Sequence, residues 1–304
     1  MKILQYLLWV VFVVLSATPA GAERTAPSST LGQAVSVGDF AVVPLLDGPQ
    51  NFPLNRFTGA DEATMQQTAG GQSAPSAFNV FLIKHGKKRF LVDTGNGALL
   101  PGRTGQLALC LKDAKIVQAD ISKIFISHLH GDHIGGLVKD GKPAFPKAKV
   151  YVAKAEYNFW MDDEAMRQAS ENVRMWFAPA RQVMRILEQN KLLVLFTPGD
   201  VLAPDITSVA LPGHTPGHTG FMLASKGEKL FFVGDLLHAV SLQMPRPDIT
   251  FYFDVDQPKA KETRLRVFKQ VAEDKIPIAG AHVPFPGVGL VRPDGNGYKL
   301  DELR

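Results

Sequence analysis

The chain has 304 residues and a formal charge of +4, from 33 lysines and arginines against 29 acidic residues. This weak charge, with no block of basic residues interleaved with aromatics, argues against a nucleic-acid-binding protein. The single cysteine, Cys110, excludes an intramolecular disulfide, so stability must come from the core and from any bound ions. Cys110 lies in an apolar stretch, where a buried and unreactive thiol is expected.

The N-terminus has the pattern of a secretory leader. Lys2 precedes an apolar run, and the small residues Ala20 and Ala22 form a cleavage pattern. An uncleaved anchor is the alternative, although the run is short for a membrane span. We expect a signal peptide over residues 1–22, cleaved after Ala22, and a periplasmic or secreted protein without a stable membrane span. Residues 23–36 are interpreted as a flexible lead-in to a single domain over residues 37–304.

The first half of that domain contains apolar segments typical of strands. A first strand is expected over residues 40–48, and the small, polar residues 59–77 are interpreted as a surface loop. Residues 78–83 and 89–95 have the form of a hairpin whose second strand ends in Asp93. A carboxylate at the end of a buried strand needs a partner. Asp93 is either a cap for the following turn or, as we favour, an acceptor that orients a neighbouring histidine.

A cluster of polar residues follows the next predicted strand, residues 121–126. Three imidazoles and a carboxylate occur within six positions, before a pair of glycines: His128, His130, Asp132 and His133. Neutral imidazole and carboxylate groups suit zinc and similar divalent ions. A loop of solvated histidines is the alternative. We favour a metal site, because the rest of the chain supplies the ligands that this cluster lacks.

The second half repeats this arrangement. Residues 148–153 are expected to form a strand and residues 155–190 to be helical; Trp160 is either a wall of a binding pocket or a core residue. Further strands, a hairpin and a helix are expected over residues 191–196, 206–211, 220–224, 229–235, 258–275, 276–282 and 288–300. The candidate functional residues follow the ends of these strands: His214, His218, Asp235 and His282.

The shared order of hairpin, strand-terminal acid, strand, histidine-bearing loop and helix predicts an α/β fold. We expect two mixed sheets packed face to face, with helices outside and the candidate ligands gathered along one edge.

These motifs, in this order, resemble the metallo-β-lactamase superfamily. The resemblance spans about residues 78 to 290 and implies an αββα sandwich with two metal sites. It assigns one ion to His128, His130 and His214. It assigns the other to Asp132, His133 and His282, with Asp235 and a water between the two ions. Asp93 would support a ligand, and His218 would have a structural role. Two zinc ions are expected, with cobalt or manganese as alternatives.

Within the superfamily, the chain is similar to methyl parathion hydrolase and to related secreted lactonases and aryl esterases. The supporting stretches include residues 144–146 and 282–289. True class B β-lactamases lack the bridging aspartate, so Asp235 argues against antibiotic hydrolysis. His238 stands where acyl-homoserine lactonases carry a tyrosine and where the organophosphate enzyme is aliphatic. This departure favours an ester or lactone carbonyl over a phosphotriester.

The expected activity is metal-dependent hydrolysis of small-molecule lactones or aryl and alkyl esters, with phosphotriesters as promiscuous substrates. Asp235 and Asp132 are expected to act in catalysis, and His238 either contacts the developing oxyanion or is a packed histidine. Phe251 and Phe253 either line an apolar pocket or pack along an edge strand. The alternatives are an organophosphate hydrolase, an acyl-homoserine lactonase, a glyoxalase II-like thioesterase, and a sulfur dioxygenase with a single iron. Trp176 and Phe177 suit a homodimer interface or the core.

Overall fold

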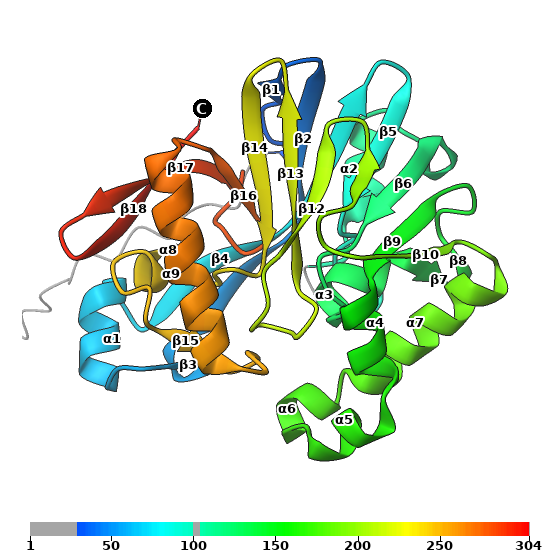
Figure 1. The fold of residues 1–304 in the computed structure, drawn as a ribbon. Coiled ribbons are helices and arrows are strands. Elements are labelled where there is room, and N and C mark those ends of the chain that lie inside the picture. The colour runs from blue at the N-terminus through cyan, green and yellow to red at the C-terminus, as the bar shows by residue number, and fades with distance from the viewer. Residues whose placement is uncertain (1–28, 100–103, 304) are drawn as a thin grey trace, which may run out of the picture.

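The computed structural model describes residues 29–99 and 104–303 (Figure 1). The expected signal peptide and the first part of the lead-in lie outside these residues. Among the helices that are described, none is long and apolar enough to cross a membrane.

The first large sheet is built by the N-terminal half of the described chain. Its strands β5, β6, β9 and β10 run parallel to one another, and the others pair antiparallel. In spatial order its strands are β1 (Val35–Val37), β2 (Phe40–Pro53), β4 (Ser73–His85), β5 (Lys88–Val92), β6 (Ile121–Phe125), β9 (Lys149–Ala153) and β10 (Leu193–Phe196).

The C-terminal half builds the second large sheet, in which only the β14–β16 pair is parallel among the described strands. In spatial order its strands are β11 (Val201–Ala203), β12 (Ile206–Ala210), β13 (Thr219–Ser225), β14 (Glu228–Gly234), β16 (Ile278–Gly280), β17 (Val288–Asp294) and β18 (Gly297–Glu302). Two short pairs are separate from both sheets: β3 (Phe57–Thr58) with β15 (Thr250–Phe251), and β7 (Val138–Lys139) with β8 (Lys142–Pro143).

The two sheets pack face to face because side chains alternate along their strands. On β4, Phe81 points between the sheets and its ring lies 5.5 Å from that of Phe232 on β14. The next residue, Leu82, points to the outer face. Phe231 of β14 likewise faces outward, away from the first sheet. Each sheet therefore has one face for the shared core and one face for helices.

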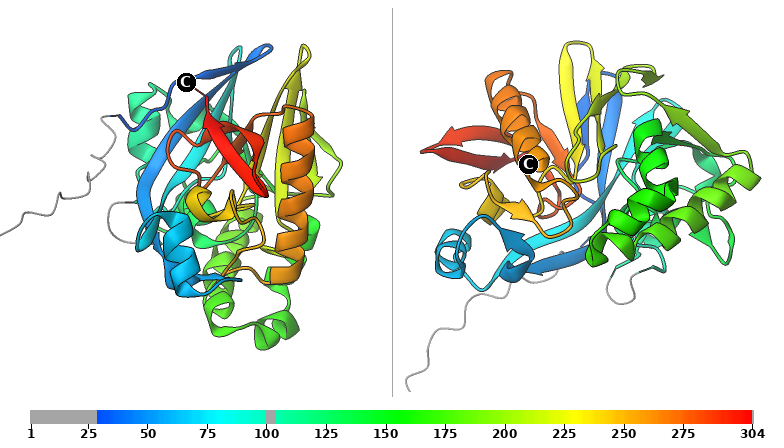
Figure 2. Two further views of the ribbon diagram at one scale, coloured as in Figure 1. Left: turned by 90° about the vertical axis from the view of Figure 1, so that its left-hand side faces the viewer. Right: turned by 60° about the horizontal axis from the view of Figure 1, so that its bottom comes forward.

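Helices cover both outer faces (Figures 1 and 2). Helices α2, α4 and α7 bury apolar side chains against the first sheet, and α9 covers the second. The helices are α1 (Glu62–Ala69), α2 (Leu107–Asp113), α3 (Gly131–Ile134), α4 (Lys154–Met161), α5 (Asp163–Gln168), α6 (Glu171–Arg174), α7 (Phe177–Gln189), α8 (Val240–Gln243) and α9 (Gln257–Glu273). The predicted αββα sandwich is confirmed.

Two segments in the first third of the chain differ from the prediction. Part of the expected flexible lead-in is ordered: the Leu46 N–H donates to Thr30 O, and Leu31 bridges to Leu45 on β2. The predicted loop over residues 59–77 contains α1 and the start of β4. Helix α1 is capped by Asp61, and it buries only Met65, so the apolar periodicity that would have revealed it is missing.

Candidate metal centre

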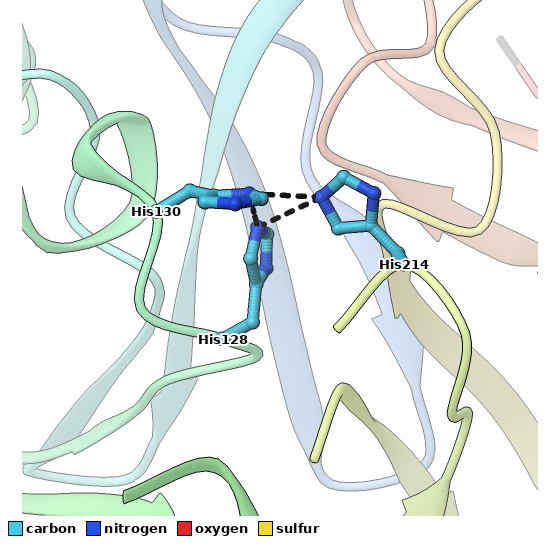
Figure 3. A group of neighbouring side chains, drawn as sticks. All are labelled: His128, His130 and His214. Carbon is cyan, nitrogen blue, oxygen red and sulfur yellow. Dashed lines mark hydrogen bonds between the residues drawn. The ribbon is translucent and has the colours of Figure 1, made fainter. Parts of the chain in front are cut away.

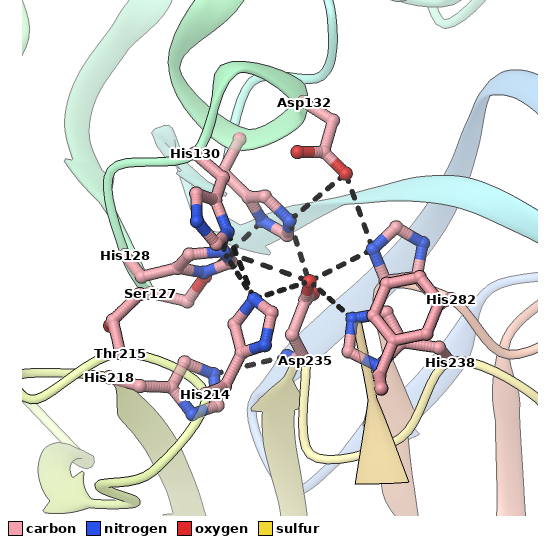
Figure 4. Close-up of polar contacts among 12 residues, drawn as sticks. Ser127, His128, His130, Asp132, His214, Thr215, His218, Asp235, His238 and His282 are labelled. Carbon is pink, nitrogen blue, oxygen red and sulfur yellow. Dashed lines mark hydrogen bonds and ion pairs between the residues drawn. The ribbon is translucent and has the colours of Figure 1, made fainter. Parts of the chain in front are cut away.

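Strand ends place the candidate ligands at one edge of the sandwich. His128 follows β6, Asp235 follows β14, and His282 follows β16. Helix α3 carries Asp132 and His133, while the loop after β12 carries His214. Parallel strands end at the same edge of a sheet, so these side chains converge although they are far apart in the sequence (Figure 4).

The first cluster consists of His128, His130 and His214 (Figure 3). His130 Nδ1 lies 2.9 Å from His128 Nε2 and 3.0 Å from His214 Nε2, and the remaining pair is 3.2 Å apart. Three neutral ring nitrogens cannot all hydrogen-bond to one another, because each either donates or accepts. A tetrahedral zinc ion with bonds of ~2.0–2.1 Å would place such nitrogens about 3.3 Å apart. The triangle therefore suits a shared cation.

The second cluster consists of Asp132, His133, Asp235 and His282. His282 Nε2 lies 3.0 Å from Asp235 Oδ2 and 3.3 Å from Asp132 Oδ2. His133 Nε2 and Asp235 Oδ1 are 3.1 Å apart, yet neither makes a hydrogen bond to a described residue. Buried polar atoms without such partners are typical of a site for an ion.

Asp235 contacts both clusters. Its Oδ2 atom lies 3.3 Å from His214 Nε2 in the first cluster and 3.0 Å from His282 Nε2 in the second. In Figure 4 the contacts of both groups meet at this carboxylate. The carboxylate of Asp235 therefore lies between the two groups of ligands, and its role as a bridge between two ions stays a prediction.

The outer nitrogen of several rings is fixed by a hydrogen bond. His133 Nδ1 pairs with Asp93 at 2.8 Å, His214 Nδ1 with Asp254 at 2.8 Å, and His282 Nδ1 with Ala77 O at 3.1 Å. These bonds leave each Nε2 free to offer its lone pair to the cluster. Burial also lowers the pKa of His214 to about 3, which keeps its ring neutral. The two clusters fit a dimetal site.

The second cluster also attracts positive charge. Burial alone would lower the pKa of His282, but the charges of Asp235 and Asp132 outweigh burial and raise it to about 10. The pKa of His133 is raised for the same reason. Without a metal, protonated histidines neutralise the two carboxylates, and a divalent ion would do so in their place.

Asp93 and His218 orient ligands without joining a cluster. Asp93 has a left-handed φ of 60° and accepts hydrogen bonds from the N–H and hydroxyl of Ser127 as well as from His133. His218 bonds through Nδ1 to Leu211 O, so its Nε2 accepts from the Asp235 N–H. A side chain at Gly234 would place its Cβ 2.5 Å from His218 Nε2, so only glycine allows this approach.

A cavity of about 830 Å³ opens above the clusters. Ligands of both clusters and His238 form its floor, and aromatic side chains form most of its wall. The ring of His238 stacks on Phe251 at 3.9 Å, and its Nε2 lies 3.2 Å from Asp235 Oδ2. Phe251 and Phe253 both line the cavity, as one of the two sequence interpretations expected.

Comparison with known proteins agrees with this geometry. The sequence pattern of the metallo-β-lactamase superfamily matches residues 75–282, which is more than half of the chain. The chain belongs to this superfamily. The narrower likeness to methyl parathion hydrolase stays a prediction.

Two solved structures resemble nearly the whole fold. The hydrolase AbOPH has a TM-score of 0.85 at 28% identity, covering 92% of this chain and 99% of its own. The dizinc quorum-quenching lactonase AidC has a TM-score of 0.83 at 28% identity, covering 90% and 98%. The N-acyl homoserine lactonase AttM of Azorhizobium caulinodans is 26% identical over 57% of this chain and 65% of its own length. The first curated relatives are matched over only 20% and 21% of their lengths.

Trp160 does not line the cavity of this metallo-β-lactamase superfamily member, so of its two interpretations the pocket wall is wrong and the core residue is correct. Its side chain is fully buried, and its ring centroid is 5.4 Å from that of His130. Trp176 lines the cavity instead. The structure places Phe177 in the core, where it packs on Trp160 at 4.7 Å.

Two buried carboxylates lie behind the ligands and were not predicted from the sequence. Asp254 holds His214, and Glu156 accepts hydrogen bonds from the loops on either side of the first cluster. Each is a single acid outside any recognisable metal-binding motif, so the sequence did not mark either of them. Phe52 and Arg56, which also line the cavity, were missed for the same reason.

Proposed function

We propose that this protein is a metal-dependent hydrolase that cleaves lactones and aryl esters at the carbonyl carbon. The observation that carries the proposal is the position of Asp235, which contacts both ligand clusters at the floor of an aromatic-walled cavity. The resemblance to a dizinc lactonase at 28% identity over nearly the whole fold supports the lactone as substrate.

The chain's own residues have distinct roles in this proposal. Bound divalent ions would supply a water of lowered pKa as nucleophile and would polarise the carbonyl oxygen. Asp235 would hold the spacing of the two sites and take up the water proton on its carboxylate. Asp132, whose side chain is 16% exposed to the cavity, would orient that water. His238 would donate a hydrogen bond to the oxygen on which negative charge develops.

The cavity wall sets the expected substrate class. Phe52, Phe251, Phe253 and Trp176 offer aromatic surface on several sides, while Arg56 adds a cation at the rim. Apolar walls with a few polar groups at the floor suit an aryl or alkyl substituent next to the reacting carbonyl. Because His238 adds a polar group at the floor, we propose phosphotriesters only as promiscuous substrates.

Acyl-homoserine lactones are the second candidate substrates. AttM and AidC both carry the name of lactonase. A hydroxyacylglutathione hydrolase of Tolumonas auensis is 27% identical over 52% of this chain, so a thioester belongs in the same comparison.

A substrate panel tests the proposal. The purified protein is stripped with a chelator, reloaded with zinc, and assayed on dihydrocoumarin, N-hexanoyl-homoserine lactone, phenyl acetate, S-lactoylglutathione and paraoxon. We expect the fastest turnover with a lactone or phenyl acetate and little turnover after stripping. Fast turnover of paraoxon alone would overturn the substrate ranking, and full activity with verified removal of both ions would overturn the mechanism. Asp235→Asn, treated in the same way, serves as the inactive control.

The metal content of the purified protein distinguishes a hydrolase from a sulfur dioxygenase with a single iron. We propose zinc as the native ion, because imidazole and carboxylate ligands suit it. Elemental analysis of protein purified without added metal should give two zinc, cobalt or manganese ions per chain. One iron per chain would favour the dioxygenase alternative.

We also propose that the protein acts outside the cytoplasm, on the basis of the leader-like residues 1–22. N-terminal sequencing of protein from the periplasmic fraction should begin at residue 23. A cytoplasmic protein that retains Met1 would contradict this proposal.

A further inference from the structure

One buried carboxylate lies outside both clusters but touches the loops that form the first of them. Glu156 is in the first turn of α4, and its side chain is fully buried. Its Oε1 accepts from the Leu129 N–H at 2.9 Å and from Trp160 Nε1 at 2.6 Å. Its Oε2 accepts from the Thr215 hydroxyl at 2.6 Å and from the Gly217 N–H at 3.1 Å. Four donors converge on one carboxylate.

The donors lie next to the ligands of the first cluster. Leu129 is between His128 and His130, and Thr215 follows His214. These two loops leave different sheets, at the ends of β6 and β12. Glu156 is therefore the acceptor that the two loops share.

The loop after His214 lies directly on the start of α4. A Cβ at Gly217 would be 2.1 Å from the backbone nitrogen of Glu156, so only glycine fits there. Burying a carboxylate is costly, and burial raises the pKa of Glu156 while its four donors oppose that rise. An apolar residue at position 156 could not accept hydrogen bonds from the two loops.

We infer that Glu156 is a positioning residue that sets the distance between His214 and the His128–His130 pair, and so the affinity of the first cluster for its ion. The inference rests on the dimetal site proposed above. It assigns a function to a side chain that touches neither substrate nor metal.

Asp47 provides a matched control. It is also fully buried and accepts hydrogen bonds from Asn96 N, Asn96 Nδ2, Gly105 N and Leu107 N. None of these donors adjoins His128, His130 or His214. Asp47 therefore reports what the loss of a buried, hydrogen-bonded carboxylate does when its donors lie away from the first cluster.

The test compares Glu156→Gln with Asp47→Asn. Glutamine places an NH₂ group opposite the Gly217 N–H or the Leu129 N–H, so at least one loop loses its acceptor.

The readouts are chelator competition, which measures the affinity for each ion, and the visible absorption of the cobalt-loaded protein, which reports ligand geometry. We expect one ion to bind at least about tenfold more weakly in Glu156→Gln, with an altered cobalt spectrum and the other ion unaffected. Asp47→Asn should lower the melting temperature but keep both affinities and the spectrum.

Equal metal affinities and spectra for Glu156→Gln and wild type would overturn the inference. If wild-type protein fails to bind two ions, the proposed metal site is wrong instead. Should Glu156→Gln not fold, Thr215→Val removes one of the four donors and Thr215→Ser retains it. Weaker binding of one ion in the valine variant and not in the serine variant would support the inference, and equal binding in the two would contradict it.

Discussion

The hydrogen bond at Nδ1 differs among the ligand histidines His133, His214 and His282, although their rings are chemically alike. His133 and His214 each bond to a carboxylate, whereas His282 bonds to the carbonyl of Ala77. A carboxylate partner makes the opposite nitrogen more basic and therefore a stronger ligand. Each cluster therefore contains one histidine whose ring is supported by an aspartate.

Substitution of Asp254 tests this support. Asp254→Asn keeps the size of the side chain but removes the negative charge beside His214, so we expect one ion to bind about 10- to 100-fold more weakly. Chelator competition provides the measurement. Asp248→Asn, six residues earlier and paired with Arg246 at the surface, should leave the affinity unchanged. Equal affinity in both variants would show that the charge of Asp254 does not act on the metal.

A second prediction at this scale concerns the reactivity of the Cys110 thiol. It is fully buried in α2, and burial raises its pKa to about 11. At pH 8 only about one thiol in a thousand would be ionised, and the thiolate is the reactive form. We expect no reaction of the native protein with a thiol reagent over an hour and one reacted thiol per chain in denaturant. Rapid reaction of the native protein would show that α2 opens readily.

At the level of elements, the short pair β3–β15 brings the aromatic wall to the cavity. Phe251 of β15 stacks on His238 and packs against Phe52 at 5.1 Å. Phe251→Ala should raise the KM for phenyl acetate about 2- to 10-fold, because an aromatic contact contributes about 0.5–1.5 kcal/mol. Metal content should stay the same. An unchanged KM would place the substrate elsewhere in the cavity.

The later part of helix α9 packs on the outer face of the second sheet, so Phe268 and Leu265 should affect stability and not activity. Phe268 is fully buried there, and Phe268→Ala should lower the free energy of unfolding by about 3–5 kcal/mol. Leu265 on the same helix is 38% exposed, and Leu265→Ala should change it by no more than about 0.5 kcal/mol. Urea unfolding measures both. A loss of metal in either variant would contradict the independence of this part of α9 from the centre.

Elements with strong apolar patterns were predictable from the sequence, and weakly patterned ones were not. The hairpin β4–β5 and helix α7 have long apolar runs or a clear helical spacing. Helix α1 buries one side chain, and β15 is two residues long, so neither has a pattern long enough to recognise.

For the whole molecule, the metal centre could be predicted because its ligands directly follow strands and form recognisable motifs. Apart from Phe251 and Phe253, the cavity wall could not be predicted, because it combines side chains of β2, β15 and the α6–α7 junction, whose spatial relation depends on the complete fold. The tryptophans illustrate this limit. The sequence left open whether Trp160 lines the pocket or packs in the core, and the packing of α4 against α7 places it in the core and leaves Trp176 at the cavity.

Removal of metal should lower the stability of the whole protein. A ligand that binds only the folded state stabilises it by mass action, by about 4 kcal/mol at a thousand times its dissociation constant. We therefore expect the melting temperature to fall when the ions are stripped and to recover on titration with zinc. Calorimetry gives the measurement, with calcium, which prefers oxygen ligands, as the control ion. No shift with zinc would contradict binding at a site formed by folding.

Both clusters combine residues from the two halves of the chain. The first needs His214 as well as His128, and the second needs Asp235 and His282 as well as His133. A nascent polypeptide cannot complete the first cluster before residue 214 has been made, or the second before residue 282. A chain that stops before β16 would therefore keep the ligands of the first cluster but lack His282 of the second.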